Sequence, residues 1–164
     1  MNRLKAFLFP EINLKFLIRT ALVAAIAFVC FTWVLIPFRI YGHSMAPTYR
    51  DGDFNFCNRL YYLFSSPSRY DVVAIRYAGT RVMLLKRILA LEGETVEFRQ
   101  GKLYVNGKSV PEPYITAASH DWNLEPRTVE SGHVYVVGDN RQVPMMAHDF
   151  GQTSINRIVG VPLW

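Results

Sequence analysis

Hydrophobic and polar positions follow two different patterns along the chain, and the change comes near residue 38. The segment Thr20–Phe38 contains no charged residue. Nineteen residues in an α-helix rise about 28 Å, which is close to the thickness of the hydrocarbon core of a bilayer. We therefore predict a transmembrane anchor helix over residues 20–38, with Trp33 near one membrane interface and Pro37 marking its end.

Basic residues precede the apolar segment, and they predict its direction. They are Arg3, Lys5, Lys15 and Arg19. Because positive residues stay on the cytoplasmic side, residues 1–19 are expected to form a short cytoplasmic segment and residues 39–164 to lie on the other side of the membrane. Ala25-Ile26-Ala27 is also similar to a signal-peptide cleavage site. Cutting there would leave a further apolar stretch at the new terminus, so we favour an uncleaved anchor.

After residue 38, short apolar runs rich in β-branched residues alternate with glycines and polar turns. The runs are Asp71–Tyr77, Thr95–Phe98, Leu103–Val105, His133–Val137 and Ile158–Val159. Asn106-Gly107 is a strong hairpin signal, whereas residues 111–127 contain three prolines and predict a long connection. We predict an all-β domain over residues 39–164, built of antiparallel sheets in a barrel-like or sandwich-like arrangement.

The composition excludes several classes of protein. With 51% hydrophobic and 19% charged residues, the chain is neither disordered nor a multi-span membrane protein. Its net charge of +5 comes from scattered residues, so no nucleic-acid partner is expected. Cys30 and Cys57 would be separated by the membrane and form no disulfide framework. The four histidines lack the spacing of metal ligands, so neither a metal nor a cofactor is predicted.

A first candidate for chemistry is Ser44, in the stretch Tyr41-Gly-His-Ser-Met-Ala-Pro-Thr48 just beyond the predicted membrane exit. A serine hydroxyl is a poor nucleophile unless a base removes its proton. His43 is adjacent, but consecutive residues of an extended segment point in opposite directions, so it is badly placed to serve Ser44. A surface role is the simpler interpretation of His43.

A second candidate is Lys86, which alternates with Leu84 and Ile88 along an apolar strand. This pattern puts an amine on the buried face, where desolvation lowers a lysine pKa. A neutral amine can accept a proton at physiological pH. The alternative is a lysine at the edge of a sheet whose amine reaches water. A third segment, Gly138-Asp139-Asn140-Arg141, follows an apolar strand and by itself indicates only a polar turn.

Taken together, the three segments are far more specific. The order Gly-x-Ser-Met-x-Pro-Thr, then Lys-Arg about forty residues later, then Gly-Asp-Asn-Arg resembles type I signal peptidases over most of Gly42–Gly160. The resemblance implies a membrane-bound serine endopeptidase that removes N-terminal signal peptides from exported preproteins, after small residues. It implies Ser44 as nucleophile, neutral Lys86 as general base and no cofactor. With the one predicted span and the basic residues before it, we expect a single-pass protein of the bacterial cytoplasmic (inner) membrane, with its N-terminus in the cytoplasm and its catalytic domain on the outer, periplasmic side.

The resemblance also implies roles for neighbouring residues. The Ser44 backbone N–H would bind the oxyanion, while Gly42 occupies a position where some members carry a hydroxyl. Met45 is a candidate pocket residue, and Asp139, Asn140 and Arg141 would support the site.

One segment departs from the family pattern. Many relatives carry a serine that bonds the catalytic lysine, but an ungapped alignment puts Pro144 there, followed by Met146, Ala147 and His148. His148 is expected to replace a family arginine by pairing with a carboxylate. What orients Lys86 is left open, and so are three other functions. These are a processing peptidase for a narrow set such as pilin or conjugation precursors, a non-catalytic preprotein-binding relative, and a Ser–Lys protease that cleaves itself or one partner.

Overall fold

The computed structural model describes residues 12–78 and 82–164. Arg3 and Lys5 of the predicted cytoplasmic segment lie outside the described residues.

A long helix leads into a β domain. Helix α2 (Leu14–Val29) begins at Asn13, whose side chain accepts a hydrogen bond of 2.9 Å from the Phe16 N–H. It continues directly as a π-helical turn, η1 (Cys30–Val34). The combined helix has 21 residues and a mean hydropathy of 2.1, so it is long and apolar enough to cross a membrane. Strand β1 follows at once, so the last four residues of the predicted 20–38 segment belong to a strand.

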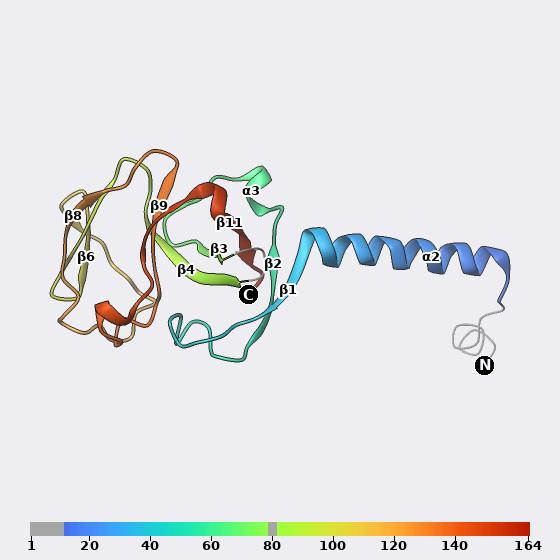
Figure 1. The fold of residues 1–164 in the computed structure, drawn as a ribbon, viewed down its shortest axis with the longest axis horizontal. Coiled ribbons are helices and arrows are strands. Elements are labelled where there is room, and N and C mark those ends of the chain that lie inside the picture. The colour runs from blue at the N-terminus through green and yellow to red at the C-terminus, as the bar shows by residue number, and fades with distance from the viewer. Residues whose placement is uncertain (1–11, 79–81) are drawn as a thin grey trace.

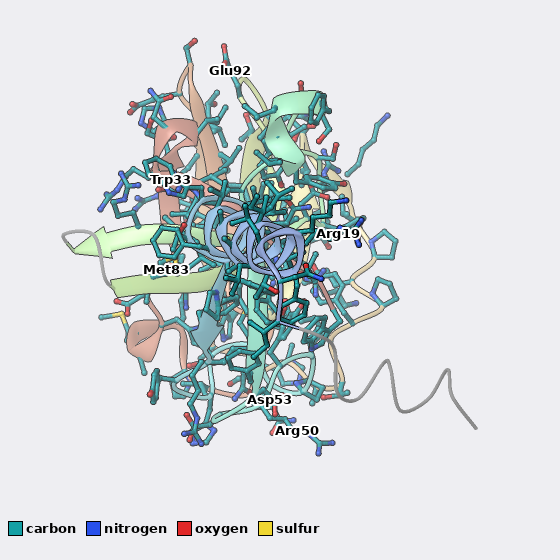
Figure 2. All side chains as sticks on the ribbon, turned by 90° about the vertical axis from the view of Figure 1, so that its right-hand side faces the viewer. Arg19, Trp33, Arg50, Asp53, Met83 and Glu92 are labelled. Carbon is teal, nitrogen blue, oxygen red and sulfur yellow. The ribbon has the colours of Figure 1, made fainter. Side chains whose placement is uncertain are left out.

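The helix stands apart from the rest of the molecule. It projects from the β domain as a rod, and the C-terminus lies near its base, beside β1 and β2 (Figure 1). None of the residues of α2 is buried. Viewed along the helix, Trp33 projects from its side, whereas Arg50 and Asp53 lie toward the margin of the domain (Figure 2). This arrangement agrees with the predicted membrane anchor.

The described β strands form two antiparallel sheets, which confirms the predicted fold class. The larger sheet has seven strands in the order β1-β2-β11-β3-β4-β9-β10, and the smaller has four in the order β7-β6-β5-β8. The strands are β1 Leu35–Arg39, β2 Phe54–Asn58, β3 Val72–Ala78, β4 Val82–Ala90, β5 Thr95–Arg99, β6 Lys102–Val105, β7 Lys108–Ser109, β8 Leu124–Thr128, β9 His133–Val137, β10 Gly151–Ser154 and β11 Ile158–Pro162.

Several predicted elements appear where the sequence indicated them. Strand β9 coincides with the predicted run, and Asn106-Gly107 joins β6 to β7. Beyond α2 and η1, the described helices are single turns: α3 (Tyr61–Phe64), η2 (Met145–Ala147) and η3 (Ile155–Arg157). Residues 111–127 are mostly irregular, although β8 begins within them at Leu124.

Strands β3 and β4 are covered on both faces. Val73 and Ile75 belong to one buried cluster, whereas Ala74, between them, belongs to another that includes Met45 and Leu85. Since alternate residues of a strand face opposite sides, apolar clusters lie above and below these strands. A polar side chain in the middle of β4 is therefore removed from water.

Candidate active site

Ser44 lies in a turn between β1 and β2 that main-chain contacts hold in place. The Gly42 N–H donates to Asp51 Oδ1 at 2.7 Å, and the Tyr49 N–H donates to the Met45 carbonyl at 3.0 Å. Gly42 has a φ of 88°, a left-handed conformation that favours glycine. Met45 is 2% exposed and packs into the apolar core beneath the turn. Met45 thereby anchors the turn that carries the Ser44 hydroxyl.

The turn after β9 docks directly on the Ser44 segment. The Asn140 N–H donates to the Ser44 carbonyl at 2.9 Å, and Asn140 Nδ2 donates to the His43 carbonyl at 3.0 Å. A Cβ on Gly138 would lie 2.3 Å from the Ser44 carbonyl oxygen, so only glycine permits this approach. The structure thus brings together two of the predicted segments, which are almost one hundred residues apart. The His43 side chain itself is exposed.

A buried ion pair ties these segments to β4. Asp139 is 2% exposed, and both of its oxygens accept from Arg87, Oδ1 from Nε at 2.8 Å and Oδ2 from Nη2 at 2.6 Å. Thr48 Oγ1 also donates to Asp139 Oδ2, at 2.6 Å. Because Arg87 follows Lys86, Asp139 fixes the strand of the lysine relative to the turn of the serine. Neither Arg87 nor Thr48 was predicted from the sequence to take part in the site.

Arg141 also holds the turn after β9 in place, through a second buried ion pair. It is 1% exposed, and its guanidinium donates to the Gly138 carbonyl at 2.9 Å and to Glu112 Oε1 at 2.6 Å. The Arg87 guanidinium lies 4.0 Å from the centre of the Tyr114 ring. The irregular segment after Pro111 therefore covers both arginines. No motif in the sequence pointed to Glu112 or Tyr114.

Lys86 is buried in the middle of the larger sheet. It is 3% exposed and pairs in register with Val73, and its strand lies between β3 and β9. The interpretation as a sheet-edge lysine is therefore wrong. Burial lowers the pKa of the Lys86 amine below the usual lysine value and outweighs the opposing charges of Asp149 and Asp139. Among residues 12–78 and 82–164, Lys86 Nζ has no hydrogen-bond partner.

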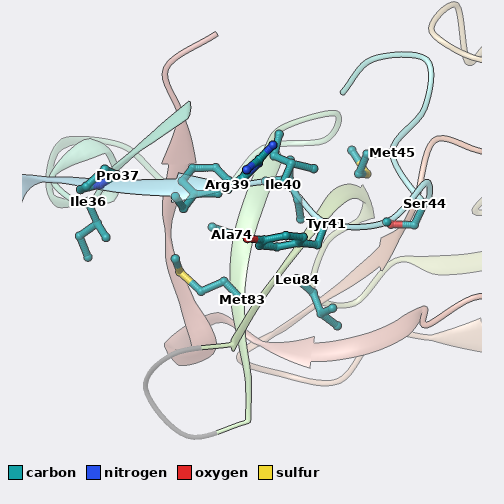
Figure 3. A pocket seen from close by; sticks show the side chains of 13 residues that line it. Ile36, Pro37, Arg39, Ile40, Tyr41, Ser44, Met45, Ala74, Met83 and Leu84 are labelled. Atoms are coloured by element: carbon teal, nitrogen blue, oxygen red, sulfur yellow. The ribbon is translucent and has the colours of Figure 1, made fainter. Parts of the chain in front are cut away.

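Ser44 and Lys86 line neighbouring pockets. A pocket of about 640 Å³ runs along β1 from Ile36 to Ser44 and Met45, as Figure 3 shows. Lys86 and Asp149 line a second pocket of about 170 Å³, and Leu84 lines both. The described structure contains no hydrogen bond between Ser44 Oγ and Lys86 Nζ. Catalytic hydrogen bonds are often long in a free enzyme and tighten once substrate binds.

The chain that carries this serine and this buried lysine matches a known family by sequence. Residues 13–163 match the family described as signal peptidase, peptidase S26. The chain belongs to this family. The resemblance inferred from the three segments is thereby confirmed.

Individual signal peptidases show the same relationship. Signal peptidase I V of Bacillus subtilis strain 168 is 36% identical, over 78% of this chain and 83% of that protein. Signal peptidase IB of Staphylococcus aureus strain N315 is 30% identical, over 90% of this chain and 85% of that protein. The crystal structure of a signal peptidase I from Enterococcus faecalis V583 is 30% identical and covers 59% of this chain and 97% of that one, with a TM-score of 0.48.

The segment that departs from the signal peptidase pattern turns mostly outward. Pro144, Met146 and Ala147 are exposed around η2, Met146 to 96%. Met145 packs against the core, and His148 turns inward, where Nε2 lies 2.7 Å from the Asn140 carbonyl oxygen and the ring centre lies 4.9 Å from that of Trp122. The predicted pairing of His148 with a carboxylate is wrong, because its partner is a main-chain carbonyl.

Proposed function

We propose that this chain is a membrane-anchored serine endopeptidase that removes N-terminal signal peptides from exported preproteins, with Ser44 as nucleophile and Lys86 as general base. The observation that carries the proposal is an amine that is 3% exposed, has a lowered pKa and lines a pocket next to that of the serine, in a chain of the signal peptidase family. Desolvation is the physical reason why such a lysine can be neutral and act as a base.

In the proposed mechanism, Ser44 Oγ attacks the scissile carbonyl while Lys86 Nζ takes its proton. The resulting ammonium later returns a proton to the leaving amine. The Ser44 backbone N–H has no acceptor within the part of the chain that the structure describes, so it is available to the oxyanion. Gly42 has no hydroxyl, so this segment supplies only a main-chain donor. Asp139, Asn140 and Arg141 hold the nucleophile turn and β4 in register.

The substrate would bind along the larger pocket, which is lined mainly by apolar side chains. Met45 and Ala74 are among its lining residues, and small side chains before the cut would bind in this pocket. The pocket begins at Ile36, two residues after the apolar helix ends at Val34. A preprotein held in the same bilayer by its own apolar segment would therefore present its cleavage site at the height of Ser44, which supplies proximity.

The proposed topology is a single pass with the N-terminus in the cytoplasm and the catalytic domain outside the bacterial inner membrane. The basic residues before the apolar segment support it. Protease added to right-side-out vesicles should digest the domain, and protease added to inverted vesicles should spare it. The opposite result would contradict this topology.

Cleavage of a synthetic preprotein by the full chain in detergent tests the function. Ser44→Ala and Lys86→Ala should each abolish cleavage. Lys86→Arg should be inactive too, since a guanidinium stays protonated. His43→Ala is the matched control and should keep wild-type activity, because its side chain is exposed and is not the proposed base. Activity in either alanine variant, or its loss in His43→Ala, would contradict the assignment.

A further inference from the structure

A buried acceptor without a partner lies beside the site. His148 Nδ1 has no hydrogen-bond partner within the described residues and is shielded from solvent. An unpaired buried polar atom destabilises the fold, so native proteins keep few of them, often for a functional reason. The other such atom in the described structure, Arg69 Nε, belongs to a guanidinium already paired with Glu94. His148 Nδ1 is the one whose isolation is unexplained.

The hydrogen bond on the other side of the ring decides what Nδ1 offers. The Asn140 carbonyl oxygen can only accept, so the nitrogen 2.7 Å from it, Nε2, carries the proton. In the neutral ring Nδ1 is therefore a bare acceptor. Burial lowers the pKa of His148, which favours that neutral ring. The edge contact with Trp122, whose ring centre lies 4.9 Å away, restricts rotation of the ring.

Three charged groups influence the pKa of His148, and they leave one candidate donor. They are Lys86 of β4, Arg141 of the turn after β9, and Asp149. Lys86 precedes Arg87, which pairs with Val137, and the next residue, Gly138, lies against the His148 ring. Asp149 is a carboxylate and cannot donate when ionised, and the Arg141 guanidinium is engaged by Glu112 and the Gly138 carbonyl. The Lys86 residue is 3% exposed, and its Nζ has no hydrogen-bond partner among the described residues. It lines the same pocket as Asp149, the neighbour of His148 in the chain.

We propose that His148 Nδ1 accepts a hydrogen bond from Lys86 Nζ and so positions the general base, a task that Pro144 cannot perform because it has no side-chain hydroxyl. The inference rests on the proposed function. A neutral amine has two N–H groups and one lone pair. If one N–H is held by His148, the lone pair is left to point toward the Ser44 hydroxyl. The contact survives proton transfer, since an ammonium donates more strongly still.

The proposal also predicts an acid switch. Protonation of His148 would place a hydrogen on Nδ1, remove the acceptor and put two cations side by side. Cleavage therefore requires two deprotonated groups, Lys86 and His148. The acid limb of kcat/KM should steepen from one proton to two once the pH falls below the lowered pKa of His148.

The contact can be tested without any substrate. In the full chain in detergent micelles, ¹⁵N NMR of histidine should show His148 as the neutral Nε2-protonated tautomer at neutral pH. Lys86→Met should shift its Nδ1 resonance and raise its pKa, since Lys86 is among the charges that lower it. Lys102→Met, an exposed lysine of β6, is the matched control and should change neither. Equal spectra for the two variants would overturn the proposal.

Two conservative variants test the catalytic consequence. His148→Gln places an amide near Nε2 and can keep the Asn140 bond, but it removes the acceptor at Nδ1. It should lose about 10- to 100-fold in kcat with little change in KM or melting temperature, because a displaced base costs rate rather than binding. His148→Asn places an oxygen near Nδ1 and should retain most of kcat. In both variants the acid limb of kcat/KM should lack the ionisation of His148 and keep the slope of one proton. Equal activity in wild type and His148→Gln would overturn the proposal.

The NMR measurement and the cleavage assay distinguish failure of the His148 contact from failure of the proposed function. A wild-type chain that cleaves no preprotein would contradict the function, while the NMR measurement would still test the Lys86–His148 contact. If cleavage depends on Lys86 but Lys86→Met leaves the Nδ1 resonance and the pKa of His148 unchanged, the proposed function stands and the positioning role of His148 is refuted.

Discussion

At the scale of single residues, Lys86 occupies a place that suits an apolar side chain. Its cross-strand neighbour Val73 and its strand neighbour Ile88 are both fully buried. An amine in such a place lowers stability, because burial disfavours its charged form. Active sites commonly accept a cost of this kind in exchange for reactivity.

Replacing the amine should therefore stabilise the fold. Lys86→Met is expected to raise the free energy of unfolding by about 1 kcal/mol, or the melting temperature by roughly 3 °C, while it abolishes cleavage. The folded pKa of Lys86 is lowered, so between that pKa and the usual lysine value folding must release a proton. The extra stability of Lys86→Met over wild type should thus grow as pH falls through this window and vanish at more alkaline pH. Thermal unfolding at several pH values checks it, and a melting temperature below wild type throughout would contradict it.

A second residue-scale prediction concerns pH and Asp149. The charge of Asp149 opposes the burial that lowers the pKa of Lys86. Asp149→Asn should therefore lower this pKa further and move the acid limb of kcat/KM toward lower pH. Asp121→Asn, at an exposed position, is the control and should leave the limb in place. A shift toward higher pH in Asp149→Asn would refute this account of the amine.

Gly138 supports a third prediction. A methyl group at this position would overlap the Ser44 carbonyl oxygen, which is main chain and cannot swing away. Gly138→Ala should push the nucleophile turn from β9, reduce cleavage about 100-fold or more and cost about 1–3 kcal/mol of stability. Kinetics and thermal unfolding would measure both effects, and wild-type cleavage would show that the close approach is dispensable.

At the scale of elements, one carboxylate joins three of them. Asp139 follows β9 and binds Arg87 of β4 and Thr48 of the nucleophile turn. Removal of one partner from a buried ion pair leaves the other charge uncompensated. Asp139→Ala should thus lower the free energy of unfolding by about 3–5 kcal/mol. Asp121→Ala should cost little, and denaturant unfolding of both variants tests the difference. Equal stability would mean that the pair is not needed to hold the elements together.

The sequence predicted the elements well where local patterning determines them. Alternating β-branched residues marked β3, β5 and β9, and Asn106-Gly107 marked a hairpin because few residues adopt its backbone conformation. Glu112 and Tyr114 could not be found this way. Their partners Arg141 and Arg87 are brought to them only by the tertiary fold. The connection of residues 111–127, in which they lie, has no hydrophobic periodicity.

The candidate site was predictable to a similar degree. Ser44, Lys86 and the turn at Gly138 were identified by motif, and the burial of Lys86 by alternation along its strand. The inward orientation of His148 could not be predicted. Its neighbours Pro144 and Met146 are exposed, and its partner, the Asn140 carbonyl, is brought to it only by the fold. The catalytic roles themselves stay a prediction that the cleavage assay decides.

At the scale of the whole molecule, large apolar side chains gather where the helix meets the domain. Those exposed on η1, β2, α3 and the end of the chain include Trp33, Phe54, Phe64 and Trp164. Aromatic residues of this kind favour the membrane interface. In single-tryptophan variants reconstituted into vesicles, brominated lipid should quench the fluorescence of Trp33 and Trp164. The fluorescence of Trp122, which is fully buried in the domain, should be unchanged. Quenching of Trp122 alone would contradict this orientation.

The position of β11 has a consequence for the timing of assembly. This strand, formed by residues 158–162, lies between β2 and β3, so it connects the part of the sheet that flanks the serine turn to the part that carries the lysine. Ser44 and Lys86 both precede this strand in the sequence, yet the two parts of the sheet have no edge in common until residues 158–162 are in place. We therefore expect cleavage to require β11, because without this strand the two parts of the larger sheet share no edge.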